Sequence, residues 1–312
     1  MKKQLLDLLV CPACLPREHP LVAEIVREQE GDIDTAILMC QHCGARFPVT
    51  AGIALLDPHA TDNGRQANKY ETAEVVSSYL WSQYGDLLDD DQASTAYATW
   101  AGMMRPQAGI ALDAGGAVGR FAFEMTERCD FAIGIDTSVA FVRAARQLMR
   151  ERSLTFSLKE EGLLRREATI LLPDSWRSER VDFLVANALA LPLRKDAIGL
   201  FASLNLVDKV PAPLDHLREM NRVTRDREAQ FLLSDPFSWS VEAAPPQAWL
   251  GGTAEGRFAG RGQANIARLL ADPAGELAPA WRVDETGHVW WKIRTHANHY
   301  ELIRSCFIRA CR

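Results

Sequence analysis

From residue 109 onward, short apolar runs alternate with longer segments whose apolar residues recur at helical spacing. This alternation is typical of strands joined by crossover helices, which build a mostly parallel sheet with helices on both faces. The pattern therefore predicts a doubly wound α/β domain. The expected strands are 109–112, 131–135, 181–185, 198–203 and 229–233, and the expected helices are 120–128, 138–151 and 213–223.

The chain before this domain divides into two parts. Residues 1–57 hold four cysteines in two pairs, and they end in an apolar stretch. Residues 57–66 (DPHATDNGRQ) are rich in turn formers and charge, which favours a linker, and apolar residues from 67 to 88 recur at helical spacing. We therefore expect a small domain at 1–57, a linker with helices that cap the active site at 58–106, and the main domain at 107–312.

Composition and charge limit the partners and the cellular compartment that we expect for this protein. A formal net charge of −6 disfavours a broad phosphate-binding surface and argues against a nucleic-acid partner. No apolar run approaches the roughly 18 residues of a membrane span, and Asp7 interrupts the short apolar stretch near the N-terminus, so we expect no signal peptide and no membrane. These features predict a cytoplasmic protein whose seven cysteines are reduced thiols or metal ligands.

Two C-x-x-C pairs, Cys11 with Cys14 and Cys40 with Cys43, are separated by 25 residues. Each pair fits a tight turn that aims two thiolates at one point, and two such turns form the four-thiolate site that zinc prefers. Four protein ligands leave no open position, so the predicted Zn²⁺ is structural. Two unrelated pairs of buried cysteines and a redox-active pair are the alternatives.

The most specific chemical pattern follows the first expected strand. An acidic residue ends the strand, a glycine-rich turn opens a helix, and a second acidic residue ends the next strand 23 residues later. Glycines let the backbone approach a ligand closely, and an acid at the second strand suits the hydroxyls of a ribose. We therefore expect a Rossmann-like nucleoside-cofactor site. Its residues are Asp113, Gly115, Gly116, Gly119, Asp136 and Thr137.

S-adenosylmethionine is the cofactor that this pattern favours. NAD is the competitor, but the glycines do not have the G-x-G-x-x-G spacing, and an acid opens the loop. A glycine-rich turn without any ligand is the third reading. Asn187 and Ala188, after the third expected strand, are expected beside the adenine, although the Asn187 amide could equally serve only its own backbone.

Three resemblances to known families refine these expectations. The glycine loop resembles motif I of class I methyltransferases, with Ala117 where many have glycine. The segment LLDLLVCP at 5–12, with FPV at 47–49 and Gly52-Ile53, resembles the small zinc-ribbon proteins that activate methyltransferases. That resemblance implies a stabilising or docking ribbon fused to its own client.

Most of residues 68–305 resembles the methyltransferase domain of ovothiol biosynthesis, which N-methylates the imidazole of 4-mercaptohistidine. The resemblance rests on YETAEVVSSYL at 70–80 with Tyr84-Gly85, GAVGR at 116–120, GIDTS at 134–138, EEG at 160–162, NLVD at 205–208 and AWLGG at 248–252. It implies that the substrate is a small histidine-derived metabolite. The ribbon is an addition to that enzyme, and an attached sulfoxide synthase part is missing.

Candidate residues around the methyl acceptor come from several segments. Asn205 and Asp208 follow the fourth strand, at the edge of the sheet where ligands bind, and could orient an amine or imidazole; Asp208 could instead cap the next segment. Expected substrate-binding residues are Tyr70, Tyr79, Trp239 and Trp249, while Trp290, Trp291, Arg294 and Tyr300 are further candidates, the last two for a substrate carboxylate. Core packing is the alternative for each tryptophan.

Three functions remain open at this point. A methyltransferase that acts on an imidazole nitrogen or thiol of a small molecule is the first. An RNA or protein methyltransferase that uses the ribbon for docking is the second, although the chain lacks the Asn/Asp-Pro-Pro-aromatic motif of many enzymes that methylate amino groups of bases. The third is a non-catalytic scaffold that binds S-adenosylmethionine. The oligomeric state is open.

Overall fold

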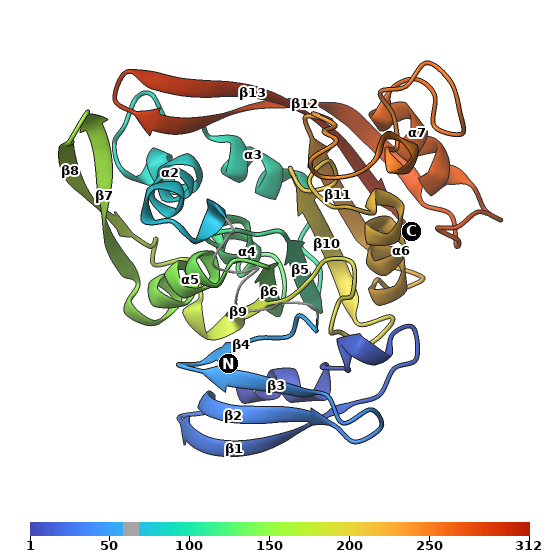
Figure 1. The fold of residues 1–312 in the computed structure, drawn as a ribbon, viewed down its shortest axis with the longest axis horizontal. Coiled ribbons are helices and arrows are strands. Elements are labelled where there is room, and N and C mark those ends of the chain that lie inside the picture. The colour runs from blue at the N-terminus through green and yellow to red at the C-terminus, as the bar shows by residue number, and fades with distance from the viewer. Residues whose placement is uncertain (59–68) are drawn as a thin grey trace.

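The computed structural model describes residues 1–58 and 69–312, and its centre is a seven-stranded sheet (Figure 1). The strand order is β12-β13-β11-β10-β5-β6-β9, and all neighbours from β11 to β9 are parallel. The parallel strands are β5 (Ile110–Ala114), β6 (Phe131–Asp136), β9 (Val181–Val185), β10 (Ile198–Leu204) and β11 (Gln230–Asp235). The prediction of a mostly parallel, doubly wound sheet is confirmed, with strand ends shifted by one or two residues.

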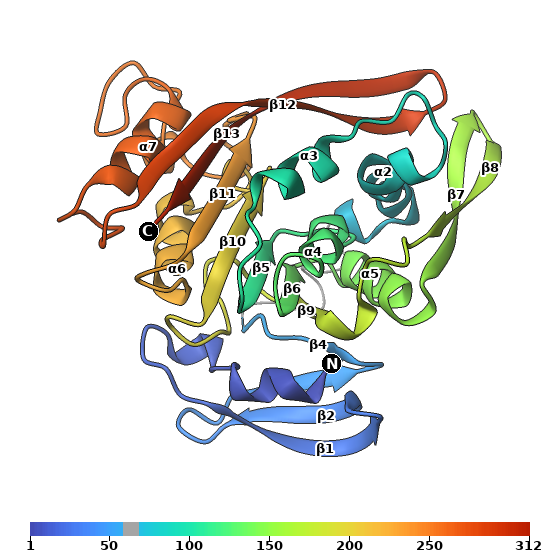
Figure 2. The same cartoon turned by 180° about the vertical axis from the view of Figure 1, so that it is seen from behind.

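Helices α2, α3, α4 and α5 cover one face of this sheet, as the view from behind shows (Figure 2). Their bounds are α2 (Ala73–Tyr84), α3 (Ala96–Met103), α4 (Arg120–Met125) and α5 (Val139–Glu151), with short 3-10 turns η3 (Lys69–Glu71) and η4 (Gly85–Leu87) beside α2. The Ser138 hydroxyl accepts from Phe141 N at 3.1 Å and so starts α5, as its sequence suggests. Most of the expected linker, 57–66, lies outside the described residues.

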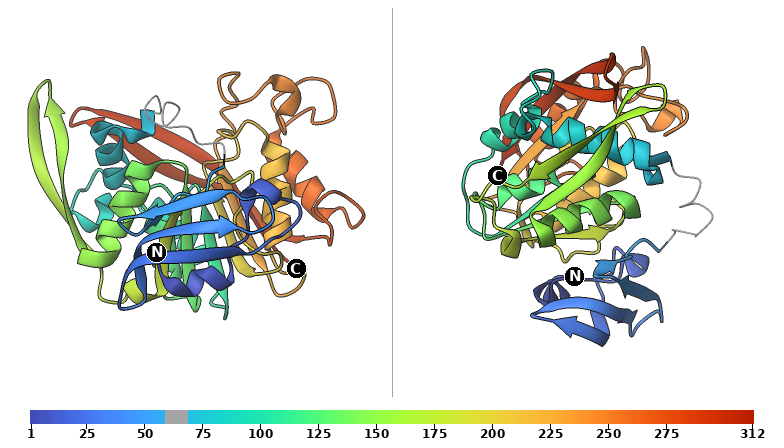
Figure 3. Two further views of the ribbon diagram at one scale, coloured as in Figure 1. Left: turned by 60° about the horizontal axis from the view of Figure 1, so that its bottom comes forward. Right: turned by 90° about the vertical axis from the view of Figure 1, so that its left-hand side faces the viewer.

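The opposite face is covered by helices α6 (Pro213–Val223) and α7 (Gly262–Ala271) and by the N-terminal ribbon. Leu5, Leu9 and Leu56 of the ribbon belong to the same buried apolar cluster as Ile133 and Leu184 of the sheet. The views in Figure 3 place the ribbon against the sheet beside α6. The ribbon is therefore one of the layers that bury the sheet, and it shares a core with the main domain.

The ribbon itself is a four-stranded antiparallel sheet, ordered β1 to β4, with two 3-10 turns at its start. It joins the main sheet at the edge strand β9, where Leu55 pairs in parallel with Val185 and Leu56 N donates to Val185 O at 2.7 Å. The ribbon thus covers the carboxyl end of this edge strand at Val185. The ribbon elements are η1 (Lys3–Asp7), η2 (Pro12–Cys14), β1 (Leu21–Gln29), β2 (Asp32–Cys40), β3 (Arg46–Thr50) and β4 (Ile53–Ala54).

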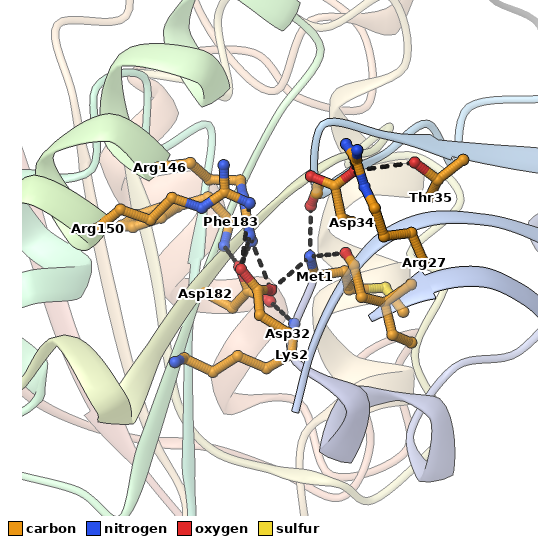
Figure 4. Close-up of polar contacts among 12 residues, drawn as sticks. Met1, Lys2, Arg27, Asp32, Asp34, Thr35, Arg146, Arg150, Asp182 and Phe183 are labelled. Atoms are coloured by element: carbon orange, nitrogen blue, oxygen red, sulfur yellow. Dashed lines mark hydrogen bonds and ion pairs between the residues drawn. The ribbon is translucent and has the colours of Figure 1, made fainter. Parts of the chain in front are cut away.

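A buried ionic network also crosses this junction (Figure 4). Arg146 of α5 pairs with Asp182 of β9 and, at 2.9 Å, with Asp32 of β2. Asp182 also accepts from Lys2 N at 2.5 Å, and the Met1 ammonium lies 2.8 Å from Asp32. Because Arg146 and Asp182 are almost fully buried, removing either partner would leave an uncompensated charge in the core.

Two antiparallel hairpins were not expected from the sequence. One joins β7 (Ser153–Glu161) to β8 (Leu164–Leu171) between α5 and β9; the other joins β12 (Arg282–His296) to β13 (His299–Cys311) and extends the main sheet. In Figure 1 the long β12–β13 hairpin arches over α3 and α2, and β7–β8 rises beside α2. The remaining short turns are η5 (Ser178–Arg180) and η6 (Pro246–Ala248). Among the described helices, none is long and apolar enough to cross a membrane.

Candidate functional site

A cavity of about 850 Å³ opens at the carboxyl ends of β5, β6, β9 and β10. This edge is where open parallel sheets bind ligands. The sheet contributes Gly115, Asp136, Asn187 and Asn205 to its lining, while α2, the β7–β8 hairpin and the β12–β13 hairpin form the other walls. The cavity is therefore shared between the core of the fold and the two unexpected hairpins.

The glycine loop has the backbone geometry that its sequence suggests. Gly115 and Gly119 have φ angles of +74° and +89°, and a Cβ at Gly119 would lie 2.5 Å from Phe183 Cε1. Ala117 also takes a positive φ, 47°, which is uncommon for a residue with a side chain. Its N–H donates to Asp136 Oδ2 at 3.0 Å, and this bond fixes the loop against the end of β6.

The two predicted acids sit side by side beneath and beside this loop. Burial raises the pKa of Asp113 to about 8, helped by the negative charge of Asp136. Burial also raises the pKa of Asp136 to about 6, against hydrogen bonds from the backbone of Ser138, Ala117 and Thr137 that lower it. Asp136 and Thr137 line the cavity, whereas Asp113 lies under the loop with its Oδ2 atom buried and unpartnered.

Side-chain hydrogen bonds from helix α2 hold the glycine loop in place. Gln83 accepts from Arg120 N at 3.1 Å through its Oε1 atom and donates from Nε2 to Tyr97 Oη at 3.0 Å. Tyr84 Oη donates to Val118 O at 2.9 Å. The segment that roofs the cavity thus also holds the loop beneath it.

A buried histidine fixes the loop after β9 by hydrogen bonds. His216 of α6 lies with Nδ1 3.2 Å from Ala188 O and Nε2 2.9 Å from Ser203 Oγ. Burial lowers the pKa of His216 to about 4, so the ring is neutral and bridges the ends of β9 and β10. Asn187 lines the cavity, and its Oδ1 accepts from Leu189 N at 2.9 Å, which is the backbone-serving role considered above.

Asn205 and Asp208 occupy different positions. Asn205 lines the cavity in a left-handed conformation (φ 56°); its Oδ1 accepts from Ser305 Oγ at 2.5 Å, and its Nδ2 is buried without a partner. Asp208 is buried behind the lining, where its Oδ2 accepts from Ser238 N at 2.7 Å. The charge of Asp208 and burial raise the pKa of the neighbouring Asp235 well above its usual range, with burial the larger cause.

The expected substrate-binding residues separate into two groups. Tyr70 and Tyr79 line the cavity. Trp239 and Trp249 are outside the part of the described chain that lines it, and their rings stack on each other with centroids 6.3 Å apart. For this pair the structure matches the packing alternative.

Several lining residues come from the hairpins. Trp291 and Arg294 of β12 were candidates in the sequence; Lys159 and Arg165 of the β7–β8 hairpin and Tyr97 of α3 were not. The only sequence signal for the hairpins is alternation of apolar and polar residues, as in the burial pattern of β7. Gly116 and Gly119 lie in the loop but not in the lining of the described chain.

The four predicted cysteines meet at one point of the ribbon. Their sulfur atoms all lie within 4.8 Å of one another, with Cys11 to Cys43 at 3.7 Å and Cys14 to Cys40 at 3.8 Å. Zn–S bonds of about 2.3 Å in a tetrahedron place sulfurs about 3.8 Å apart. The donor set therefore fits zinc in both chemistry and size.

Two family models match separate parts of the chain. Residues 112–228 match a methyltransferase domain, and residues 2–52 match a Trm112p-like protein. No curated protein matches the chain in sequence.

Among solved structures, the YcgJ protein of Bacillus subtilis is 13% identical, with 69% of this chain and 97% of that one covered and a TM-score of 0.42. A structure of the Haloferax volcanii Trm112 methyltransferase activator with a methyltransferase is 18% identical. The match covers 51% of this chain and 60% of that one, with a TM-score of 0.35. Phosphoethanolamine N-methyltransferase 2 of Haemonchus contortus, solved with S-adenosyl-L-methionine, is 13% identical. The match covers 58% of this chain and 37% of that one, with a TM-score of 0.40.

Proposed function

We propose that this chain, which is an S-adenosylmethionine-dependent methyltransferase, methylates an imidazole nitrogen or a thiol of a small histidine-derived metabolite. The carrying observation is the cavity: one wall is the cofactor edge of the sheet, and the others are α2 and the two hairpins of the same chain. A small acceptor fits between these walls, whereas an RNA or a protein could insert only a single flipped base or side chain. The resemblance of 68–305 to the ovothiol methyltransferase domain supports the class of acceptor.

The cofactor edge carries the residues that would hold S-adenosylmethionine. Asp136 offers carboxylate oxygens to the ribose hydroxyls, the backbone around Gly115 faces the methionine part, and Asn187 and Ala188 border the adenine. Thr137 adjoins Asp136 in the lining, and Asp113, Gly116 and Gly119 shape the loop from below. When bound, the cofactor supplies an electrophilic methyl group on a sulfonium.

Methyl transfer from a sulfonium requires mainly that the nucleophile be held in line, with its lone pair free and water excluded. Asn205 is the candidate for this role, because the residue lines the cavity next to the glycine loop and its buried Nδ2 has no hydrogen-bond partner within the described chain. A Cβ on Gly115 would lie 2.9 Å from Leu206, which shows how closely the two loops approach. Asp208 acts through the backbone of Ser238 and is a positioning residue.

The ribbon has a structural role in this proposal. Residues 1–57 hold one Zn²⁺ through Cys11, Cys14, Cys40 and Cys43 and cover a face of the sheet, residues 58–106 carry the roof of the cavity, and residues 107–312 carry out the reaction. The metal has no open coordination position and takes no part in chemistry.

A second candidate is suggested by the match of residues 2–52 to a Trm112p-like protein. A ribbon of that kind fits a methyltransferase that acts on RNA or on a protein. Here, however, the ribbon packs on the main domain through β9 and the shared apolar cluster. The net charge of −6 also disfavours RNA.

A radiolabelled methyl-transfer screen separates the candidates. The holoenzyme is incubated with labelled S-adenosylmethionine and, in turn, histidine-derived thiols, other small thiols and total RNA. We expect label in an imidazole or thiol compound, and we expect Asn205→Ala to lose turnover while it still binds the cofactor. Incorporation into RNA with a steep salt dependence would establish the second candidate instead.

A further inference from the structure

Helix α5 begins directly after the cofactor edge of the sheet, and the N–H groups of its first turn all have partners. A helix leaves its first four N–H groups without partners inside the helix. Here Ser138 N donates to Asp136 Oδ1 at 2.9 Å, and Phe141 N donates to Ser138 Oγ at 3.1 Å. The two N–H groups between them, those of Val139 and Ala140, donate to a residue that is distant in the sequence.

That residue is Glu71, the last residue of η3, just before α2. Its Oε1 accepts from Val139 N at 2.8 Å and its Oε2 accepts from Ala140 N at 3.0 Å. Both oxygens of one carboxylate thus contact the positive end of a helix, where a negative charge is favoured. Because Ser138 already caps α5, the main effect of Glu71 is to hold η3 and the start of α2 against this end of the helix.

Tyr70, the residue before this carboxylate, is held at the same place. Ser138 Oγ donates to Tyr70 O at 3.1 Å, and the Tyr70 ring contacts those of Tyr79 and Phe141 with centroids 6.0 and 5.7 Å away. All three aromatic residues line the cavity. Ser138 therefore joins Tyr70 to the Asp136 carboxylate, through its hydroxyl on one side and its N–H on the other.

Glu71 is outside the cavity lining of the described chain, so its effect on a ligand must pass through the groups that it positions. The next residue, Thr72, caps α2 by accepting from Val75 N at 3.3 Å, and Val75 lines the cavity. One carboxylate therefore fixes both Tyr70 and the first turn of α2 relative to the cofactor edge.

The charge of Glu71 and its hydrogen bonds act in opposite directions on the cofactor site. Burial raises the pKa of Asp136, and the negative charge of Glu71 adds to this rise. As a charge alone, Glu71 would therefore disfavour the ionised acid that the ribose requires. Its two charge-assisted hydrogen bonds, in contrast, hold one wall of the cavity in place.

We infer that Glu71 is a positioning residue for S-adenosylmethionine: it fastens Tyr70 and the start of α2 to α5, so that the cofactor ribose is enclosed between Tyr70 and Asp136. The inference rests on the proposed cofactor edge, and it holds whichever acceptor is methylated.

The test measures cofactor binding at pH 8, where Asp136, whose pKa burial raises to about 6, is ionised. S-adenosylhomocysteine is titrated calorimetrically into the full zinc-containing chain; it has no sulfonium, so a lost attraction to the methyl donor does not contribute. We expect Glu71→Ala to weaken binding about tenfold, as loss of hydrogen bonds to a charged group implies, and Glu71→Gln, which keeps one acceptor oxygen, to weaken it less. Wild-type affinity in both variants would leave Glu71 as a neighbouring charge only and overturn the inference.

Tyr70→Ala shows whether Glu71 acts through its neighbour. If Glu71 places Tyr70, the double variant should bind no more weakly than the weaker single variant, because effects that pass through one contact do not add. Additive losses would mean that the two residues act independently, against the inference. If Glu71→Ala does not fold, Glu71→Gln takes its place in the same comparison.

Asp215→Asn is the matched control. Asp215 also lies in the first turn of a helix, α6, but it is 54% exposed and outside the described cavity lining. Its removal takes a negative charge from a helix N-terminus and should leave cofactor affinity unchanged. An equal loss in Asp215→Asn and Glu71→Ala would show a general effect of helix stability and would overturn the positioning role.

Asp136→Asn separates this inference from the proposed cofactor edge. Wild-type affinity in Asp136→Asn would overturn the edge itself, and the inference with it. Weak binding in Asp136→Asn together with full affinity in Glu71→Ala would overturn only the role of Glu71.

Discussion

Acidifying the protein from pH 8 to pH 5 should weaken its binding of S-adenosylmethionine about tenfold, because Asp136 takes up a proton. The carboxylate borders the cavity, and burial, with a smaller contribution from Glu71, raises its pKa from 3.8 to about 6. Only the ionised form offers two acceptor oxygens to the ribose hydroxyls. The raised pKa moves this requirement into an accessible pH range.

The magnitude follows from the fraction ionised. With a pKa of about 6, Asp136 is about one-eleventh ionised at pH 5, half ionised at pH 6 and nearly fully ionised at pH 8. Affinity should therefore fall about twofold at pH 6 and about tenfold at pH 5, and it should be flat above pH 7. A tenfold change corresponds to about 1.4 kcal/mol.

Isothermal titration calorimetry with S-adenosylhomocysteine across pH 5–8 measures this directly. Asp136→Asn should bind weakly at every pH and lose the titration, while Glu71→Gln should move the midpoint to lower pH, because one neighbouring negative charge is gone. Asp113→Asn checks the second acid, whose pKa is about 8. Wild-type affinity that stays constant, or a slope that persists in Asp136→Asn, would refute the reasoning.

Three further predictions concern stability. Cys43→Ser removes an exposed cysteine of the cluster and should lower both the zinc content and the melting temperature of the whole chain, because the ribbon shares its core with the sheet. Metal analysis of the wild type should find about one zinc per chain. A stable zinc-free protein would contradict this prediction. Gly119→Ala should lower the free energy of unfolding in urea by about 1–3 kcal/mol, since the φ of Gly119 is +89° and the new Cβ would clash with Phe183. The control variant Gly102→Ala, whose Cβ on α3 would meet no atom within 4 Å, should cost no stability. Folding lowers the pKa of His216 from 6.5 to about 4, so the unfolded chain binds this proton more tightly than the folded one. Up to about 3 kcal/mol of stability should therefore be lost as the pH falls from 6.5 through 4. His216→Phe should remove that part of the pH dependence, and an unchanged pH profile in the variant would count against the buried neutral ring.

The parallel core could be predicted because its signals are local. Strand 131–136 has no polar side chain from Phe131 to Ile135 and ends in Asp136, and helix α5 begins at a serine cap. The glycine loop and its two acids likewise stand within about 25 residues of one another, so spacing alone brings Asp113 and Asp136 together. The cysteine cluster could also be predicted from the sequence, since duplicated C-x-x-C pairs are typical of zinc sites.

The acceptor side could not be predicted in the same way. Strands β7 and β8 carry many charged residues, and β12 alternates imperfectly because a bulge interrupts its pairing between Val283 and Glu285. Trp291 and Arg294 reach the cavity only because β12 pairs with β13, a contact between distant segments. Trp249, chosen from a resemblance, stacks on Trp239 and donates from Nε1 to Ala244 O at 2.9 Å, and it is outside the cavity lining of the described chain.

The merging of the ribbon and the sheet into one core makes the two ligands that we propose for this protein, zinc and S-adenosylmethionine, thermodynamic partners. Anything that stabilises the sheet also stabilises the layer in which the four thiolates converge. Because coupling between binding sites is reciprocal, S-adenosylmethionine bound in the cavity would tighten the binding of zinc by the same free energy by which zinc tightens the binding of the cofactor. The zinc affinity measured by equilibrium competition with a chelator, with and without cofactor, thus reports how much of the active site is occupied.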